Sequence, residues 1–318
     1  MPAPVTYADG RTVKTPRGCA AIWRAANGKY LMWIHNTALQ LHSTVWPMTG
    51  RDQAWLIGGV ERNGRIEWSQ PELVCYGPPT RGVSYPDLVE VDGKFFISAT
   101  NKREARLIEV DPELIAGLWR QRENKTAARK GIIFARAAAV KSAQSVAMPR
   151  LPDLRDGGGF AVELRLKFDD LKSGQVLLDS RDEQGRGLAL TTGTNGRLQF
   201  IMNDGVRSFA WASDAATIST GKVHHVTVSV DGGPKMLTFV IDGRLNDGGD
   251  DPARPFGTGR FWPVEDKVNQ TTGPQLGDVS GGPWLRLAPS LQGELRGVKI
   301  YDRYLRTSEA IANYRASD

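Results

Sequence analysis

Residues 223–243, VHHVTVSVDGGPKMLTFVIDG, constrain the fold more than any other stretch of the chain. Val226, Val228 and Val230 alternate with small polar residues, which predicts a strand with one buried face and one wet face. Residues 231–234, Asp-Gly-Gly-Pro, break the run because glycine supplies positive φ and proline fixes φ. The alternation then resumes, so the stretch predicts two long antiparallel strands joined by a turn.

The chain from residue 131 onwards repeats this pattern. Residues 160–168 give the clearest period-two strand, and a helix is expected to begin at residue 307. Residues 131–148 suit an edge strand that crosses into a sandwich. Further strands are expected, with glycine-rich turns between many of them, at residues 175–180, 187–192, 197–202, 208–212 and 291–301.

The order of the hairpin in residues 223–243 carries a resemblance. A His-His-Val start, an alternating strand, Asp-Gly, a second alternating strand and Asp-Gly resemble the central hairpin of concanavalin A-like sandwiches of the laminin G and pentraxin type. The resemblance extends over residues 131–318 and implies a jelly-roll β-sandwich that binds glycans.

Three hairpins are predicted in the first half of the chain. Asn27-Gly28, Asn63-Gly64 and Asp92-Gly93 each lie between short runs rich in aromatic and β-branched residues. Such hairpins, with irregular connections between them, are typical of the blades of an antiparallel propeller or of a meander. A short helix is expected to start at Asp111-Pro112, because aspartate caps a helix and proline suits its first turn.

This half also resembles the last blades of a sialidase-like propeller. Residues 64–71, GRIEWSQP, resemble a degenerate Asp-box, although Asn63 stands where the box has aspartate. Residues 84–88, SYPDL, are similar to the segment that carries the catalytic tyrosine of sialidases. The resemblance implies that Tyr85 is the nucleophile and that Arg51 belongs to the carboxylate-binding arginines.

The implied chemistry makes physical sense for an acidic sugar. An arginine offers a planar fork of donors that fits a carboxylate at two points, which lysine does not. A tyrosine attacks an anomeric centre beside a carboxylate with less repulsion than a carboxylate nucleophile, but it needs a neighbouring base and a separate acid. In the family these residues come largely from preceding blades.

About 130 residues supply at most about three propeller blades, whereas closure needs about four. We therefore expect that a missing N-terminal propeller portion completes the domain, or that the chain descends from a shortened enzyme.

Residues 243–285 are rich in glycine, aspartate, proline and asparagine, and we interpret them as a long loop region. Its aromatic side chains are candidates for stacking on sugar rings; the alternative is that they pin the loops to the sandwich. These candidates are Phe256, Phe261, Trp262 and Trp284.

Asp247, Asp250 and Asp251 could hold Ca²⁺ together with backbone carbonyls, and no other cofactor is indicated. Their spacing differs from a DxDxDG loop, so a solvated acidic loop is the alternative. His224 and His225 are adjacent on a strand, face opposite sides and cannot chelate one metal together.

Charge and composition limit the classes of partner that the chain is expected to bind. The formal net charge is +6, and the most basic segment, residues 120–130, is interrupted by Glu123, so nucleic acid is not expected as a partner. No stretch approaches the roughly 20 apolar residues of a membrane span. Cys19 and Cys75 form no CxxC motif and could pair or stay free. The resemblance implies an extracellular or periplasmic location, although the N-terminus lacks a secretory pattern.

The sequence therefore predicts an all-β protein in three parts. Residues 1–110 are expected to form partial propeller blades, residues 111–130 a helix and linker, and residues 131–318 a concanavalin A-like jelly-roll sandwich. The leading hypothesis is the C-terminal part of an exo-sialidase-type glycoside hydrolase with a glycan-binding sandwich. The alternative is a non-catalytic lectin or interaction module with a remnant propeller.

Overall fold

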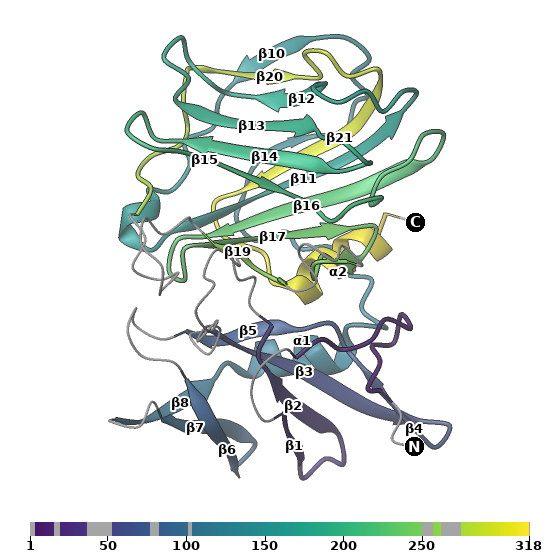
Figure 1. Ribbon diagram of the computed structural model, residues 1–318, viewed down its shortest axis with the longest axis vertical. Helices are drawn as coiled ribbons and strands as arrows, with labels where there is room; N and C mark the ends of the chain where they lie inside the picture. The colour runs from purple at the N-terminus through teal and green to yellow at the C-terminus, as the bar shows by residue number, and fades with distance from the viewer. Residues whose placement is uncertain are drawn as a thin grey trace, which may run out of the picture.

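The computed structural model describes residues 4–15, 20–36, 53–76, 83–100, 104–249, 257–261 and 275–317. These residues form antiparallel sheets, two short α-helices and one 3-10 turn (Leu154–Asp156), so the chain is an all-β protein. Figure 1 shows the sheets of the C-terminal half above those of the N-terminal half, with both helices between them.

The C-terminal half is a sandwich of two antiparallel sheets. One has seven strands in the order β18 (Arg244–Leu245), β17 (Met236–Ile241), β16 (Val223–Asp231), β11 (Gly159–Phe168), β21 (Gly293–Tyr301) and β9 (Ile132–Arg136), with β19 (Arg260–Phe261) beside β17. The other has six, in the order β10 (Gln144–Ala147), β20 (Trp284–Leu287), β12 (Val176–Asp179), β13 (Gly187–Thr192), β14 (Leu198–Asn203) and β15 (Ser208–Ala212).

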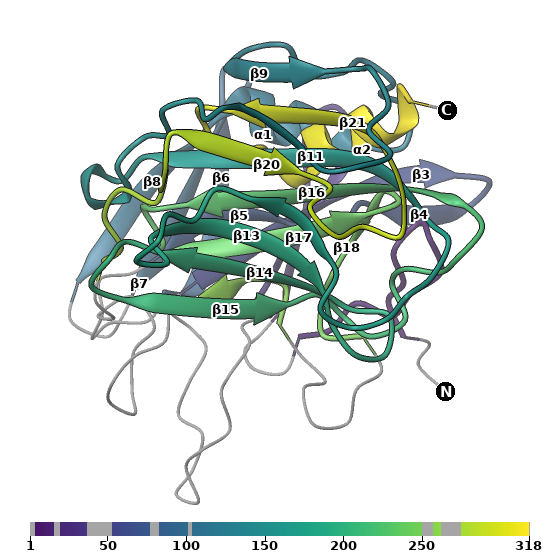
Figure 2. The ribbon, with the colours of Figure 1, turned by 90° about the horizontal axis from the view of Figure 1, so that it is seen from above.

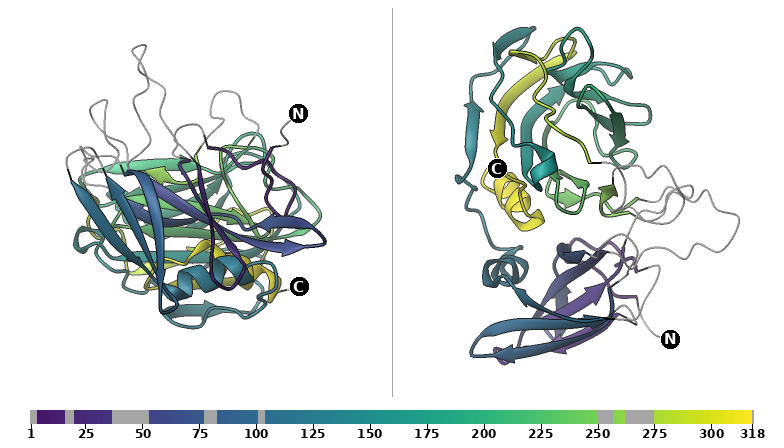
Figure 3. Two further views of the ribbon diagram at one scale, coloured as in Figure 1. Left: turned by 90° about the horizontal axis from the view of Figure 1, so that it is seen from below. Right: turned by 90° about the vertical axis from the view of Figure 1, so that its left-hand side faces the viewer.

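The main core lies between these two sheets, which face each other in the side view of Figure 3. Phe160 and Val228 point inward from the seven-stranded sheet, and Leu190 and Phe200 point inward from the six-stranded sheet. All four are essentially inaccessible to solvent. The period-two pattern therefore predicted this core correctly.

The polar face of the central hairpin is not wet, contrary to the sequence-based expectation. Thr227 is inaccessible to solvent, and Ser229 is almost inaccessible. The Ser229 hydroxyl donates to Leu305 O (2.9 Å) and accepts from Leu305 N (2.8 Å). Helix α2 (Thr307–Arg315) and the N-terminal half cover much of this outer face of the seven-stranded sheet. The backbone of Leu305 thus satisfies Ser229, whereas the buried Thr227 hydroxyl has no hydrogen-bond partner among the described residues.

The three predicted hairpins of the N-terminal half are present. They join β1 (Ala21–Arg24) to β2 (Tyr30–Ile34), β3 (Gln53–Arg62) to β4 (Arg65–Trp68), and β6 (Ser84–Val91) to β7 (Lys94–Thr100). The turns at Asn63-Gly64 and Asp92-Gly93 have positive φ at both residues, as a tight hairpin requires.

Propeller blades are not confirmed. Two of the hairpins merge into one five-stranded sheet because β2 pairs with β3, and β5 (Glu72–Tyr76) adds to the other end of β3. The third hairpin forms a separate three-stranded sheet with β8 (Ala105–Val110). The described residues thus form two open sheets that do not close on each other, and β5 and β8 lie where irregular connections were expected.

Helix α1 (Pro112–Arg120) begins as predicted, since Asp111 Oδ1 accepts a hydrogen bond from Glu113 N (2.8 Å). It packs against β3 and crosses α2 closely: a Cβ at Gly117 would lie 2.7 Å from Ser308 Oγ. The Gln70 side chain also joins the halves, donating to Gly243 O (2.7 Å) and accepting from Leu245 N (2.6 Å).

Candidate functional site

The outer face of the six-stranded sheet carries an exposed aromatic ring beside an arginine. Strand β20 has the sequence Trp-Leu-Arg-Leu, in which Leu285 and Leu287 are fully buried in the core. Because side chains alternate along a strand, Trp284 and Arg286 both point outward. Trp284 is 59% exposed. Residue 284 therefore lies in a strand, whereas the sequence pattern favoured a loop.

Asp179 of the neighbouring strand orients two arginines on this face. It stands opposite Arg286 in the register of β12 and β20, and Arg286 Nη2 lies 3.0 Å from Asp179 Oδ2. Arg181 Nε and Nη2 donate to the two carboxylate oxygens at 3.0 and 2.9 Å. Burial by itself would raise the pKa of Asp179, but the Arg181 hydrogen bonds and the charges of both arginines outweigh it and lower the pKa.

The arginines keep donors for a ligand. Arg286 Nε and Nη1, and Arg181 Nη1, donate no hydrogen bond to the residues that the structure describes, and the Arg286 side chain is 47% exposed. With Asp179 ionised, the three side chains carry a net charge of +1. We call Trp284, Arg286, Arg181 and Asp179 the outer-face cluster. It combines a flat apolar surface with exposed guanidinium donors and a net positive charge, which suit a carboxylate.

Figure 2 shows the six-stranded sheet at the front of the sandwich, with β13, β14 and β15 in one layer. The opposite sheet has much of its outer face covered by α2 and the N-terminal half. The outer-face cluster therefore lies on the sandwich surface that faces away from the N-terminal half.

The predicted nucleophile lies elsewhere. Tyr85 is in β6 of the three-stranded sheet, and Figure 1 places β6 and β20 at opposite ends of the molecule. Tyr85 is 54% exposed, and its backbone has φ of 52°, where the pairing of β6 with β7 shifts register. Such left-handed backbone is uncommon for residues other than glycine.

Several predicted site residues lie outside the described residues: Arg51, Phe256, Trp262, Asp250 and Asp251. The backbone of Phe261 is part of β19, where it pairs with Met236. The roles of these residues stay predictions.

Asp247 is engaged by cations of the N-terminal segment. Its carboxylate lies 3.3 Å from Arg11 Nη1 and 3.2 Å from Lys14 Nζ, and its side chain is almost fully buried. Gly249 N also donates to it (3.1 Å). The Asp247 carboxylate thus balances two cations, and calcium binding by this loop stays a prediction. No group of three or more potential metal ligands occurs among the described residues.

His224 and His225 face opposite sides, as predicted. His224 Nδ1 lies 2.9 Å from Asp242 Oδ2, while His225 packs against Tyr314 of α2. Cys75 is a buried free thiol whose pKa burial raises to about 12, and Cys19 lies outside the described residues. No helix within the described ranges is long and apolar enough to cross a membrane.

The sequence analysis missed Arg286, Arg181 and Asp179. The alternation of Trp284-Leu-Arg-Leu was a usable signal, since it puts Trp284 and Arg286 on one face of a strand. The pairing with Asp179 depends on strand register and has no local signal in the sequence.

The two antiparallel sheets with a shared core define a lectin-like β-sandwich. Residues 140–312, more than half of the chain, match the family model described as the concanavalin A-like lectin/glucanases superfamily. The chain belongs to this superfamily. No curated protein sequence matches it.

Solved structures give weaker likenesses. A Ruminococcus gnavus IT-sialidase CBM40 bound to alpha2,3 sialyllactose is 15% identical, with a TM-score of 0.40, covering 57% of this chain and 98% of that one. A botulinum neurotoxin serotype D binding domain is 12% identical, with a TM-score of 0.37, covering 54% of this chain and 42% of that one.

A mutant Trypanosoma rangeli sialidase with trans-sialidase activity is 16% identical, with a TM-score of 0.37. That likeness covers 94% of this chain and 53% of the sialidase, so the chain spans about half of the sialidase's length. At these identities and TM-scores, the likenesses do not indicate a function for this chain.

Proposed function

We propose that the sandwich is a glycan-binding module for sugars that carry a carboxylate, and that it binds them at the outer-face cluster. The observation that carries the proposal is the exposed Trp284 ring on the same strand face as Arg286. Membership of a lectin and glucanase superfamily supports glycan as the ligand class.

The chemistry of the cluster supports an acidic sugar over a neutral one. An aromatic ring stacks on the apolar face of any pyranose, so Trp284 selects sugars in general. The free Nε and Nη1 donors of Arg286 add charge-assisted hydrogen bonds that favour a carboxylate. Asp179 and the Arg181 carbonyl hold the Arg286 guanidinium through Nη2, so little side-chain freedom is lost on binding.

The test compares two sugars that differ only in the carboxylate, glucuronic acid and glucose, or galacturonic acid and galactose. Their affinities for the full chain are measured by calorimetry or by ligand-observed NMR. We expect the acidic sugar to bind more tightly, and Arg286→Lys to reduce that preference by about tenfold, because one ammonium group cannot both pair with Asp179 and present the separate donors of a guanidinium to the sugar. Trp284→Ala should lower the affinity for both sugars.

Matched controls separate this effect from general perturbation. Arg296→Lys changes another exposed arginine, on β21 in the other sheet, and should leave both affinities unchanged. Val206→Ala removes an exposed apolar side chain from the same domain with no expected effect. Equal affinity for the acidic and neutral sugars, or unchanged preference in Arg286→Lys, would refute the proposal.

A second candidate function is hydrolysis of a terminal acidic sugar, as in an exo-sialidase, with Tyr85 as nucleophile. The left-handed backbone of Tyr85 favours it, because strained backbone often marks functional residues. If the chain is a hydrolase, it should release the terminal sugar, with a further propeller portion added to the chain where activity requires it. Tyr85→Phe should abolish that release without changing sugar binding by the sandwich. Binding without turnover would leave the lectin module as the function.

A further inference from the structure

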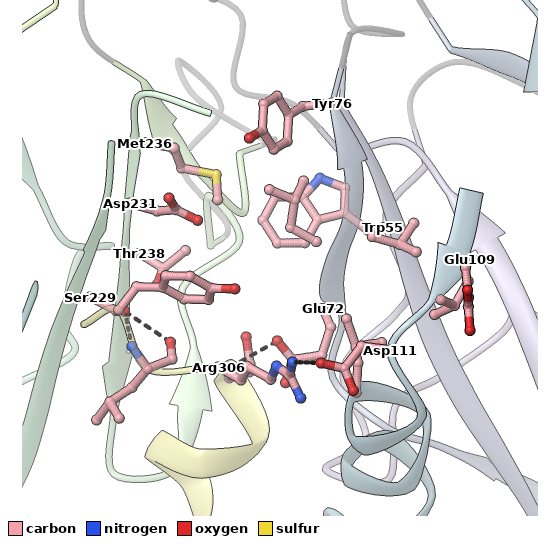
Figure 4. A pocket seen from close by; sticks show the side chains of 17 residues that line it. Trp55, Glu72, Tyr76, Glu109, Asp111, Ser229, Asp231, Met236, Thr238 and Arg306 are labelled. Atoms are coloured by element: carbon pink, nitrogen blue, oxygen red, sulfur yellow. Dashed lines mark hydrogen bonds and ion pairs between the residues drawn. The ribbon is translucent and has the colours of Figure 1, made fainter. Parts of the chain in front are cut away.

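A cavity of about 270 Å³ lies where the N-terminal half meets the outer face of the seven-stranded sheet (Figure 4). One wall comes from β3 and β5, and the other from β16 and β17. Residues 304–307, which lead into α2, also line it. This cavity is distinct from the outer-face cluster, which lies on the other sheet.

Asp231, at the end of β16, is a partly buried carboxylate with few partners. Its Oδ1 accepts a hydrogen bond from Gly233 N (3.0 Å), and Figure 4 shows the side chain pointing into the cavity. Burial raises its pKa to about 6. The nearby guanidinium of Arg306 does not compensate it, because Arg306 Nη2 pairs with Asp111 at 2.5 Å. A carboxylate taken out of water without a counter-ion costs free energy.

Aromatic side chains surround this carboxylate. The Tyr76 hydroxyl and the Asp231 carboxylate both lie beside Gly233. If Gly233 carried a Cβ, that atom would be 2.7 Å from Tyr76 Oη and 3.3 Å from Asp231 Oδ1. Tyr76 and Tyr304 both line the cavity with Asp231. Burial and then the charge of Asp231 raise the pKa of each phenol. Trp55 faces Asp231 from the opposite wall in Figure 4.

The charges that line the cavity have one predominant sign. Glu72, Glu109, Asp111 and Asp231 contribute acidic groups, whereas Arg306 is the base among the lining residues. Because like charges repel, this lining disfavours an anionic ligand such as the acidic sugar of the outer-face cluster. It favours a cation that can balance Asp231.

We propose that this cavity binds a small organic ammonium ion, with Asp231 as its counter-ion and the rings of Tyr76, Tyr304 and Trp55 as its walls. Aromatic faces attract ammonium groups through their quadrupole, and the attraction is larger where water is excluded. The volume suits a molecule of about the size of choline rather than an oligosaccharide. Ligand binding would also bridge the two halves of the chain, since both contribute walls.

The test titrates the full chain with choline and with its neutral isostere, in which carbon replaces the nitrogen. We expect saturable choline binding and at least about tenfold weaker binding of the isostere, because the isostere lacks the charge that Asp231 balances. Asp231→Asn should weaken the binding of choline to a similar extent. Asp156→Asn, an exposed aspartate elsewhere in the sandwich, is the matched control.

A second pair of variants tests the aromatic wall. Tyr76→Phe keeps the ring and should retain choline binding, whereas Tyr76→Ala removes it and should weaken binding severalfold. Equal binding of choline and the isostere, full affinity in Asp231→Asn, or no saturable choline binding would each overturn the proposal. The isostere comparison uses the unaltered chain, so it decides the question even where a variant fails to fold.

Discussion

At the scale of single residues, a buried carboxylate joins the sandwich to its C-terminal helix. Glu163 of β11 accepts from Lys299 Nζ (2.7 Å), from Tyr301 Oη (3.1 Å) and from the side-chain amide of Asn313. His225 Nε2 lies 3.4 Å away. Burial alone would raise the pKa of Glu163, but the hydrogen bonds and charges of His225 and Lys299 outweigh it and lower the pKa to about 2.

This pKa predicts how stability depends on pH. Since the folded pKa of Glu163 is below the unfolded value, its contribution is present above about pH 4.5 and is lost as the pH falls towards 2. The difference in free energy of unfolding between the unaltered chain and Glu163→Gln should therefore shrink by about 3 kcal/mol as the pH falls from 7 to 2. Urea unfolding at both pH values measures this difference.

Glu183→Gln, at an exposed position in a turn of the sandwich, is the control and should show no such convergence. A gap between Glu163→Gln and the unaltered chain that is constant with pH would show that Glu163 titrates alike in both states.

At the scale of elements, the N-terminus of α2 is capped by the other half of the chain. Glu72 of β5 accepts from Thr307 N (3.0 Å), Ser308 N (2.7 Å) and Ser308 Oγ (2.7 Å). The first backbone N–H groups of a helix have no partner within the helix, so an external acceptor stabilises it. The carboxylate is also favoured there by the helix dipole.

Removal of this cap should destabilise the protein. Glu72→Ala leaves two buried N–H groups without their acceptor, and we expect a loss of about 3 kcal/mol in the free energy of unfolding. Glu72→Gln keeps one acceptor oxygen and should lose less. Glu109→Ala, which removes an exposed partner of Lys94, should change stability by under about 1 kcal/mol. Equal losses for Glu72→Ala and Glu109→Ala in chemical unfolding would contradict the capping role.

The elements with strong local patterns were the ones that the sequence predicted. Strands β13 and β15 coincide with their predicted ranges, and both helices begin where their capping signals lie. Strand β20 was missed because its four residues lie next to glycine and proline, which favour loops. The Trp284 side chain was still singled out as exposed, while its neighbours in the outer-face cluster were not.

At the scale of the whole molecule, the sequence could not show which faces are covered. The polar face of β16 looked like a solvent face, yet Thr227 and Ser229 lie under α2 and the N-terminal half. The cap of Glu72 on α2 and the bridge of Gln70 to Gly243 connect residues far apart in the chain. Local periodicity carries no information about such pairings, so the cavity at Asp231 had no signal in the sequence.

The whole-molecule arrangement separates two surfaces of different chemistry. The outer-face cluster lies on the sheet that faces away from the N-terminal half, with a net positive set of side chains around Trp284. The cavity lies at the junction of the halves and is lined mainly by acidic and aromatic residues. Ligands of opposite charge are thus expected at the two places.

The most direct test of the glycan-binding proposal is a crystal structure of the full chain with an acidic sugar bound. The account predicts the sugar ring stacked on Trp284, with its carboxylate within hydrogen-bond distance of Arg286, in front of β20 and β12. A sugar found instead in the cavity beside Asp231, or on the N-terminal sheets near Tyr85, would contradict it.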